Sequence, residues 1–120
     1  MKSKQMNQRL VYSFPELETK YYEEVNWQEG DETGSHVVYG DVFAPYIEQM
    51  VIQQNNTEVQ KIFDFIESLL AENDEYFAEV IMFSVLERLM SDKEIFDKCK
   101  LYFGKRTEEQ SKKIAKGYTL

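Results

Sequence analysis

The sequence predicts an all-α protein, a single-domain antiparallel bundle of about five to six helices. In the second half of the chain, apolar residues recur three and four positions apart, which is the spacing of the buried face of a helix. Residues that commonly cap helices precede several of these stretches. At 120 residues, 42% of them hydrophobic, the chain can form one core but not two. Residues 1–120 are therefore expected to form one domain.

Two central helices are predicted over residues 57–73 and 75–90. Asn56 or Thr57 would cap the first helix, because Thr57 and Gln60 have the spacing of a capping box. Its apolar face consists of Val59, Ile62, Phe63, Ile66, Leu69 and Leu70. Asn73-Asp74 would cap the second helix, which is apolar nearly all round and is expected to be buried on several sides. The short connection makes the two helices antiparallel neighbours.

These two helices share a pattern at a spacing of 20 residues, between residues 63–70 and 83–90. Two interpretations are open. Any two helices that face a core show such a pattern, or the two form a HEAT-like helix pair at the core of the bundle. The shared pattern recurs only once, which gives fewer than the three repeats that a solenoid usually needs.

Two further helices are predicted after residue 90. Ser91 to Glu94 has the pattern of a capping box, and Gly104 lies where the glycine that follows a helix is common. Thr107 to Gln110 would open a short polar helix. Residues 105–120 carry five basic and two acidic residues, so this segment either folds back on the acidic body or stays solvated. Residues 1–12 and 105–120 are expected to be the most loosely attached parts.

The first half of the chain is less regular. Ser13 to Glu16 has the pattern of a helix start with Pro15 in the first turn, and residues 28–35 read as a loop. Residues 36–39 fit either a short strand or the start of a helix. Asp41 would cap the helix that follows, which leaves Pro45 in its first turn, where proline is tolerated.

The composition and the motifs argue against an enzyme. His36 is the single histidine and Cys99 the single cysteine, so no Cys-His or Ser-His-Asp arrangement and no internal disulfide is expected. No P-loop, GxGxxG motif or calcium-binding loop is present, and no cofactor or metal is predicted. Glu67, Glu79 and Glu87 are interpreted as marking solvent-facing edges of helices. Glu87 is the exception left open, because it lies in the most apolar helix and, if buried, must be paired or protonated.

The net charge of −8 argues against binding to nucleic acid, because phosphate must be met by lysine and arginine. No apolar stretch is long enough to cross a membrane, and no signal peptide pattern follows the first residues. A single cysteine fits a reducing compartment. We therefore expect a cytoplasmic protein that binds neither nucleic acid nor membranes, with an oligomeric state that the sequence leaves open.

The most informative feature for function is a window without positive charge. Residues 21–60 contain eight carboxylates, six aromatic side chains, and no lysine or arginine. Such a stretch gains from a basic partner, and tyrosine and tryptophan often anchor interfaces. Tyr21, Phe43 and Tyr46 fall at core positions, whereas Trp27 either packs down or stands exposed. The predicted partner-binding residues are Tyr22, Glu23, Glu24, Trp27, Glu29, Asp31, Glu32, Tyr39 and Asp41.

Four segments resemble a group of small bacterial proteins: Phe14-Pro15-Glu16-Leu17, and the stretches 39–47, 62–67 and 85–89. In that group a Phe-Pro-Glu segment precedes two helices that each carry a hydrophobic-Glu-x-hydrophobic signature. The resemblance covers roughly residues 13–105. It implies an immunity protein of the kind found beside secreted polymorphic toxins, and it implies no catalytic residues.

Together these observations lead to two hypotheses. The first is a non-enzymatic protein-binding module, a cytoplasmic immunity protein that neutralises a basic, nuclease-like toxin. The alternative is a helical adaptor or regulatory scaffold protein with no toxin partner.

Overall fold

The computed structural model describes residues 2–118 and confirms the all-α fold class, with no strand among these residues. The N-terminal half contains α1 (Lys2–Ser13), a 3-10 turn (Pro15–Leu17), α2 (Glu18–Val25), α3 (Ser35–Val38), a π-helical segment (Tyr39–Phe43) and α4 (Ala44–Ile52). The C-terminal half contains α5 (Asn56–Leu70), α6 (Glu75–Glu79), a π-helical segment (Val80–Leu86), α7 (Glu87–Met90), α8 (Lys93–Cys99), a 3-10 turn (Lys100–Tyr102) and α9 (Lys105–Tyr118).

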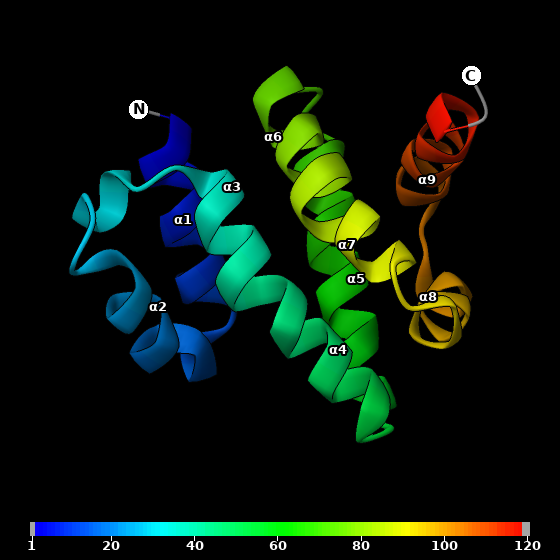
Figure 1. Ribbon diagram of the computed structural model, residues 1–120, viewed down its shortest axis with the longest axis horizontal. Helices are drawn as coiled ribbons and strands as arrows, with labels where there is room; N and C mark the ends of the chain where they lie inside the picture. Colours follow the sequence, from blue (N-terminus) through cyan, green and yellow to red (C-terminus); the bar gives the residue numbers. More distant parts are fainter. Residues whose placement is uncertain (1, 119–120) are drawn as a thin grey trace.

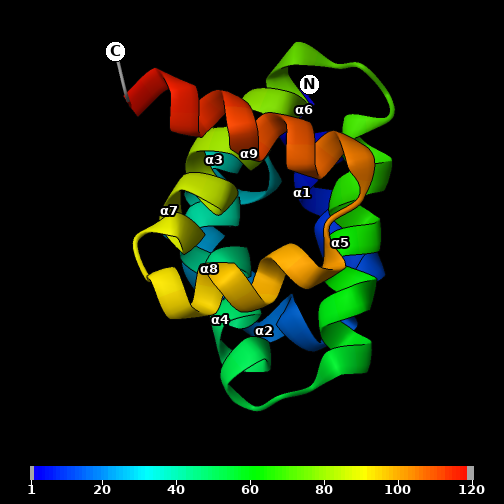
Figure 2. The same cartoon turned by 90° about the vertical axis from the view of Figure 1, so that its right-hand side faces the viewer.

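The helices form a bundle with two distinct ends. Because the π-helical segments continue their neighbours, α3–α4 and α6–α7 are single rods, and the described residues form seven rods. Figure 1 shows α5 antiparallel to α6–α7, as predicted, with α3–α4 crossing beside them. The helices α1 and α2 and the loop after α2 lie at one end of the long axis, and α8 and α9 lie at the other. Figure 2 shows α8 and α9 running across the body at that second end.

A cluster of aromatic rings joins the N-terminal segments to α5. The Phe43 ring is fully buried, and its centroid lies 5.4 Å from that of Phe14, 5.8 Å from that of Phe65 and 5.6 Å from that of Tyr39. These separations are those of favourable tilted and edge-to-face pairs. Phe14 therefore holds the turn before α2 against α3–α4 and α5, while Pro15 starts the 3-10 turn.

The N-caps of two helices differ from the sequence prediction. Asn55 caps α5 by accepting a hydrogen bond from Glu58 N at 3.2 Å, because the chain turns through Gln54, at a φ of 59°, just before it. Asp92 rather than Ser91 caps α8, since the Ser91 hydroxyl donates to Arg88 O and closes the preceding helix. The prediction for α6 is confirmed, because the Asp74 carboxylate accepts from the backbone of Tyr76 and Phe77.

Residues 36–39 are helical, and the prediction that Asp41 caps a helix is wrong. Asp41 lies inside a continuous rod that starts at Ser35. Pro45 would break an ordinary helix, because it has no N–H and its ring crowds the carbonyl four residues earlier. The π-helical segment before it changes the register, with Ala44 N donating to Tyr39 O five residues back. The wider turn lets the rod continue through the proline.

Both terminal segments are attached more firmly than expected. Met6 and Leu10 of α1 are fully buried, so the expectation of loose attachment is wrong for residues 2–12. At the other end, Thr107 and Ile114 of α9 are buried, and α9 packs against α5. The predicted loose attachment of residues 119–120 lies outside the described residues.

Glu67 of α5 anchors the start of α9, so its interpretation as a solvent-facing edge is wrong. Its carboxylate accepts hydrogen bonds from Arg106 N, Thr107 N and Thr107 Oγ1, at 2.9 to 3.0 Å. Gly104 is needed at this point, because a Cβ there would lie 2.5 Å from Glu67 Oε1. Burial raises the pKa of Glu67, but the hydrogen bonds and the Arg106 guanidinium outweigh it, and the net pKa lies below the ordinary value of 4.5.

We expect Glu67→Gln to lower the free energy of unfolding at pH 7 by about 1–3 kcal/mol, the range for hydrogen bonds to a charged group. Because the pKa of Glu67 is lowered by folding, its contribution is complete above pH 4.5 and is lost as the pH falls through the folded-state pKa. Urea denaturation at pH 7 and pH 3 measures the free energy of unfolding. The difference in this free energy between wild type and Glu67→Gln should shrink at pH 3. The control Glu79→Gln, at an exposed position, should change the free energy of unfolding little at either pH. A difference that is the same at both pH values would contradict this role for Glu67.

Candidate functional site

The strongest candidate for a binding site is an acidic surface formed by α2 and the loop after it. It comprises seven of the predicted residues: Tyr22, Glu23, Glu24, Trp27, Glu29, Asp31 and Glu32. Trp27 stands out from the loop with 74% of its surface exposed, which decides between the two alternatives left by the sequence. This surface lies at the end of the molecule opposite α8 and α9 (Figure 1).

Asn7 of α1 holds the loop from below. Its side chain is fully buried, and Nδ2 donates to Asp31 O at 3.0 Å and to Thr33 O at 2.7 Å. Asn7 Oδ1 accepts a hydrogen bond from Ser35 Oγ at 2.8 Å. Buried polar groups are stable only when they are satisfied in this way. One side chain therefore fixes both the loop and the start of α3.

Contacts within the acidic surface complete the support. Tyr21 is buried below it, and its hydroxyl donates to Asp31 Oδ1 at 2.6 Å. Burial, with the Asp31 hydrogen bond, raises the pKa of Tyr21 well above its ordinary value, so the phenol remains a donor at neutral pH. Thr33 Oγ1 accepts from Glu29 N at 3.2 Å, and Gly30 takes the left-handed conformation that the turn requires, with a φ of 61°. Trp27 is thus presented on a supported loop.

The charge of this surface is not neutralised by the chain itself. Among the described residues, none of the ion pairs involves a carboxylate of α2 or of the loop. The ion-paired carboxylate that lies nearest to this surface in the sequence is that of Glu48 on α4, which is 3.6 Å from the Arg88 guanidinium. Carboxylates gathered without counter-charges create a negative field that attracts cations.

Two predicted site residues fall elsewhere. Tyr39 is wrong as a surface residue, because it is fully buried and its hydroxyl donates to Met6 O at 2.6 Å. The sequence pattern of residues 36–39 could not predict that Tyr39 is buried, because its burial depends on contact with α1. Asp41 is exposed on the π-helical segment, which packs beside α2.

A second acidic group was missed by the sequence analysis. The Tyr46 hydroxyl lies between Glu16 Oε1, at 2.9 Å, and a carboxylate oxygen of Glu58. Burial, together with these two carboxylates, raises the pKa of Tyr46. The three residues link the turn before α2 to α4 and α5. No local pattern could predict this contact, because Tyr46 lies 30 residues after Glu16 and 12 residues before Glu58.

The single histidine and the single cysteine lie on different elements, α3 and α8. His36 Nδ1 lies 2.9 Å from Ser84 Oγ in an exposed contact between α3 and the second π-helical segment. Cys99 is buried, and burial raises the pKa of its thiol to about 12, which keeps it protonated at neutral pH. Within residues 2–118, no three histidine, cysteine, aspartate or glutamate side chains are grouped as metal ligands.

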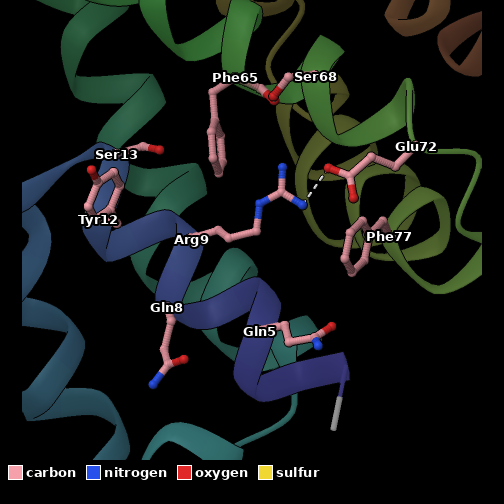
Figure 3. A pocket seen from close by; sticks show the side chains of 9 residues that line it. All are labelled: Gln5, Gln8, Arg9, Tyr12, Ser13, Phe65, Ser68, Glu72 and Phe77. Carbon is pink, nitrogen blue, oxygen red and sulfur yellow. Dashed lines mark hydrogen bonds and ion pairs between the residues drawn. The ribbon is translucent and has the colours of Figure 1, made fainter.

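A cleft lies where α1 meets α5 and α6. It encloses about 560 Å³, and Figure 3 shows Arg9 reaching across it to Glu72, at 2.5 Å. The Arg9 guanidinium also lies 5.7 Å from the centre of the Phe77 ring. The Arg9 side chain therefore links α1 to Glu72, which follows α5.

The fold defines a small all-α domain that exposes an acidic surface at one end. The chain belongs to the family described as a domain of unknown function (DUF7674), whose pattern matches residues 7–118. No curated protein and no solved structure matches the chain. The HEAT-like interpretation of α5 and α6–α7 therefore stays a prediction. In the part of the chain that the structure describes, no helix is long and apolar enough to cross a membrane.

Proposed function

We propose that this protein is a non-enzymatic binding module, a cytoplasmic immunity protein that neutralises a basic, nuclease-like bacterial toxin. The single observation that carries the proposal is the exposed Trp27 ring on a supported loop among uncompensated carboxylates. A large aromatic side chain that is 74% exposed costs free energy in water, and a partner that covers it recovers that cost.

The charge of the acidic surface favours a basic partner. Complementary charge speeds the encounter of two proteins and excludes partners of the wrong sign. A nuclease must bind phosphate, so its active site is lined by lysine and arginine. An acidic surface that covers such a site would exclude the nucleic acid. The toxin itself is implied by the resemblance of the four sequence segments, and the charge is consistent with it.

The test begins with the gene next to the one that encodes this chain. Its product is expressed in bacteria from an inducible promoter, with and without this protein, and colony survival is counted. The proposal expects a toxic product, rescue by this protein, and a purified complex of the two. A neighbouring product that is harmless, or a toxic one that this protein neither binds nor neutralises, would favour the helical adaptor instead.

Trp27→Ala is expected to weaken binding of that toxin by about 2–4 kcal/mol, as for a central aromatic anchor. The matched control is Tyr12→Ala, which removes an aromatic ring that is 88% exposed but lies on α1, outside the acidic surface. Isothermal titration calorimetry measures both. Equal affinities for the two variants would show that Trp27 is not the anchor.

Removing the charge of three carboxylates of the acidic surface should act mainly on the rate of association with the toxin. The triple variant Glu23→Gln, Glu29→Gln and Glu32→Gln keeps Asp31, which Tyr21 needs, and should slow association at low salt and flatten its salt dependence. The matched control changes three exposed carboxylates elsewhere: Glu79, Glu94 and Glu109, each to glutamine. Stopped-flow rates at low and high salt compare them. If both triple variants slow association equally, only net charge matters and the acidic surface is not the contact.

A further inference from the structure

A cleft at the other end of the molecule has a different character from the acidic surface. It lies between α8 and α9, encloses about 440 Å³, and falls in the size range of small-molecule sites, about 300–1,000 Å³. Its apolar wall comes from four residues on successive elements: Met90, Phe96, Phe103 and Ala115. Figures 1 and 2 both show α8 and α9 side by side at this end, away from α2 and its loop.

The wall of the cleft is held in place by ring contacts. The Phe103 ring lies 5.8 Å from that of Phe96 and 5.2 Å from that of Phe63, which is fully buried in the core. Phe96 is itself buried apart from a small part of its surface. Rings fixed on both sides cannot collapse into the cleft without losing these contacts. The apolar wall is therefore formed before any ligand arrives.

The polar part of the lining consists of two lysines, Lys100 and Lys112, together with Glu108 and Ser111. Lys100 Nζ lies 5.1 Å from the centre of the Phe96 ring, and Lys112 lines the α9 side. Their carboxylate neighbours, Asp97 at 3.3 Å and Glu108 at 3.1 Å, form exposed ion pairs, which contribute little and exchange readily. Residues 93–116 carry eight basic and four acidic side chains, against six and eighteen in residues 1–92. The cleft thus lies in a net-positive part of an acidic protein.

We propose that this cleft binds a small anionic amphiphile, a single medium-length alkyl chain that ends in a carboxylate. The chain lies against the apolar wall, where removing its methylene groups from water drives binding. The carboxylate meets Lys100 and Lys112 at the mouth. The inference goes beyond the proposed function, because it uses none of the residues of the acidic surface and its failure would leave that proposal untouched.

The test compares three ligands that share one alkyl chain: octanoate, 1-octanol and octylammonium. Calorimetry on the full chain measures affinity below the micelle concentration, and methyl NMR locates the ligand through Met90 and Ala115, with Met6 of α1 as the distant reference. A protein of net charge −8 attracts cations without any specific site. Preference for octanoate over octylammonium would therefore report the local lysines, and saturable shifts at Met90 and Ala115 alone are expected.

Variants measure separately how much the apolar wall and the lysine contact with the carboxylate contribute to ligand binding. Lys100→Gln combined with Lys112→Gln should weaken octanoate about fivefold or more and leave 1-octanol unchanged, since each ion pair contributes up to about that factor. Ala115→Phe, at an exposed position, should fill the cleft and abolish binding of both without unfolding α9. The matched control is Lys98→Gln combined with Lys113→Gln, on the same two helices but outside this cleft, which should bind octanoate as wild type does.

Three results would overturn the proposal. The first is octanoate that binds no better than octylammonium. The second is loss of octanoate binding in the control pair as large as in the cleft pair. The third is shifts at Met6 that match those at Met90, which would indicate general partition into the core. Circular dichroism on every variant confirms that helix content is unchanged.

Discussion

Phe43→Ala should lower the free energy of unfolding by about 3–5 kcal/mol, the range for removing a large buried ring. Phe43 is fully buried where the rings of Phe14, Tyr39 and Phe65 converge. Its loss leaves a cavity at the junction of the turn before α2, the α3–α4 rod and α5, and none of these elements can move in alone to fill it. Urea denaturation followed by circular dichroism measures the change.

The matched control for this prediction is Phe83→Ala. Phe83 lies on the second π-helical segment with 55% of its surface exposed, so truncation removes the same ring from a largely solvated site. Surface substitutions of this kind usually change stability by no more than about 0.5 kcal/mol. If the two variants were equally stable, the aromatic cluster would not be the centre of the core.

Asn7→Ala should cost about 2–6 kcal/mol of unfolding free energy. The substitution removes the donor to two backbone carbonyls, Asp31 O and Thr33 O, and each buried group left unsatisfied costs about 1–3 kcal/mol. The loss is local as well as global, because Asn7 joins α1 to the loop that carries Trp27. Hydrogen exchange at Glu32 N and Thr33 N, which bond back to Glu29 O and Gly30 O, should accelerate more than exchange within α5.

Gln8→Ala is the neighbouring control, since Gln8 is exposed and one residue further along the same helix. It should leave both stability and the exchange of the loop amides close to wild type. Partner binding should also distinguish Asn7→Ala from Gln8→Ala. Asn7→Ala should weaken partner binding although Asn7 itself is buried and does not contact the partner, because a loop that is no longer fixed must be ordered on binding. Unchanged exchange in the loop of Asn7→Ala would show that Asn7 does not support the acidic surface.

Local patterns in the sequence predicted the parts of the fold that depend on neighbours along the chain. The apolar spacing of residues 59–70 identified α5, and the continuous apolarity of residues 76–90 identified the α6–α7 rod. Helix caps were less accurate, as at Asn55 and Asp92, because several nearby residues can cap and the path of the preceding chain selects one. Ser91 was available, but its hydroxyl closes the helix before it.

Contacts between distant segments accounted for the remaining differences. Tyr39 is of a residue type common at interfaces, yet it is buried because α1 covers it, and Met6 O accepts a hydrogen bond from its hydroxyl. Glu67 lies on a helix surface, and its role as the anchor of α9 depends on Arg106 at the start of α9, which is 39 residues later in the chain. Asn7 lies in a polar N-terminal stretch with no sign of a core residue until the loop carbonyls meet it.

The sequence alone determined that this chain is a helical domain with a one-sided acidic window, because helix periodicity and charge are properties of neighbouring residues. The tertiary structure decided which members of that window face solvent. It exposed Trp27 on a loop fixed by Asn7, buried Tyr39, and brought Met90, Phe96, Phe103 and Ala115 together around a cleft with lysines at its mouth. Burial and juxtaposition depend on contacts between segments far apart in the chain, and local periodicity carries no record of them.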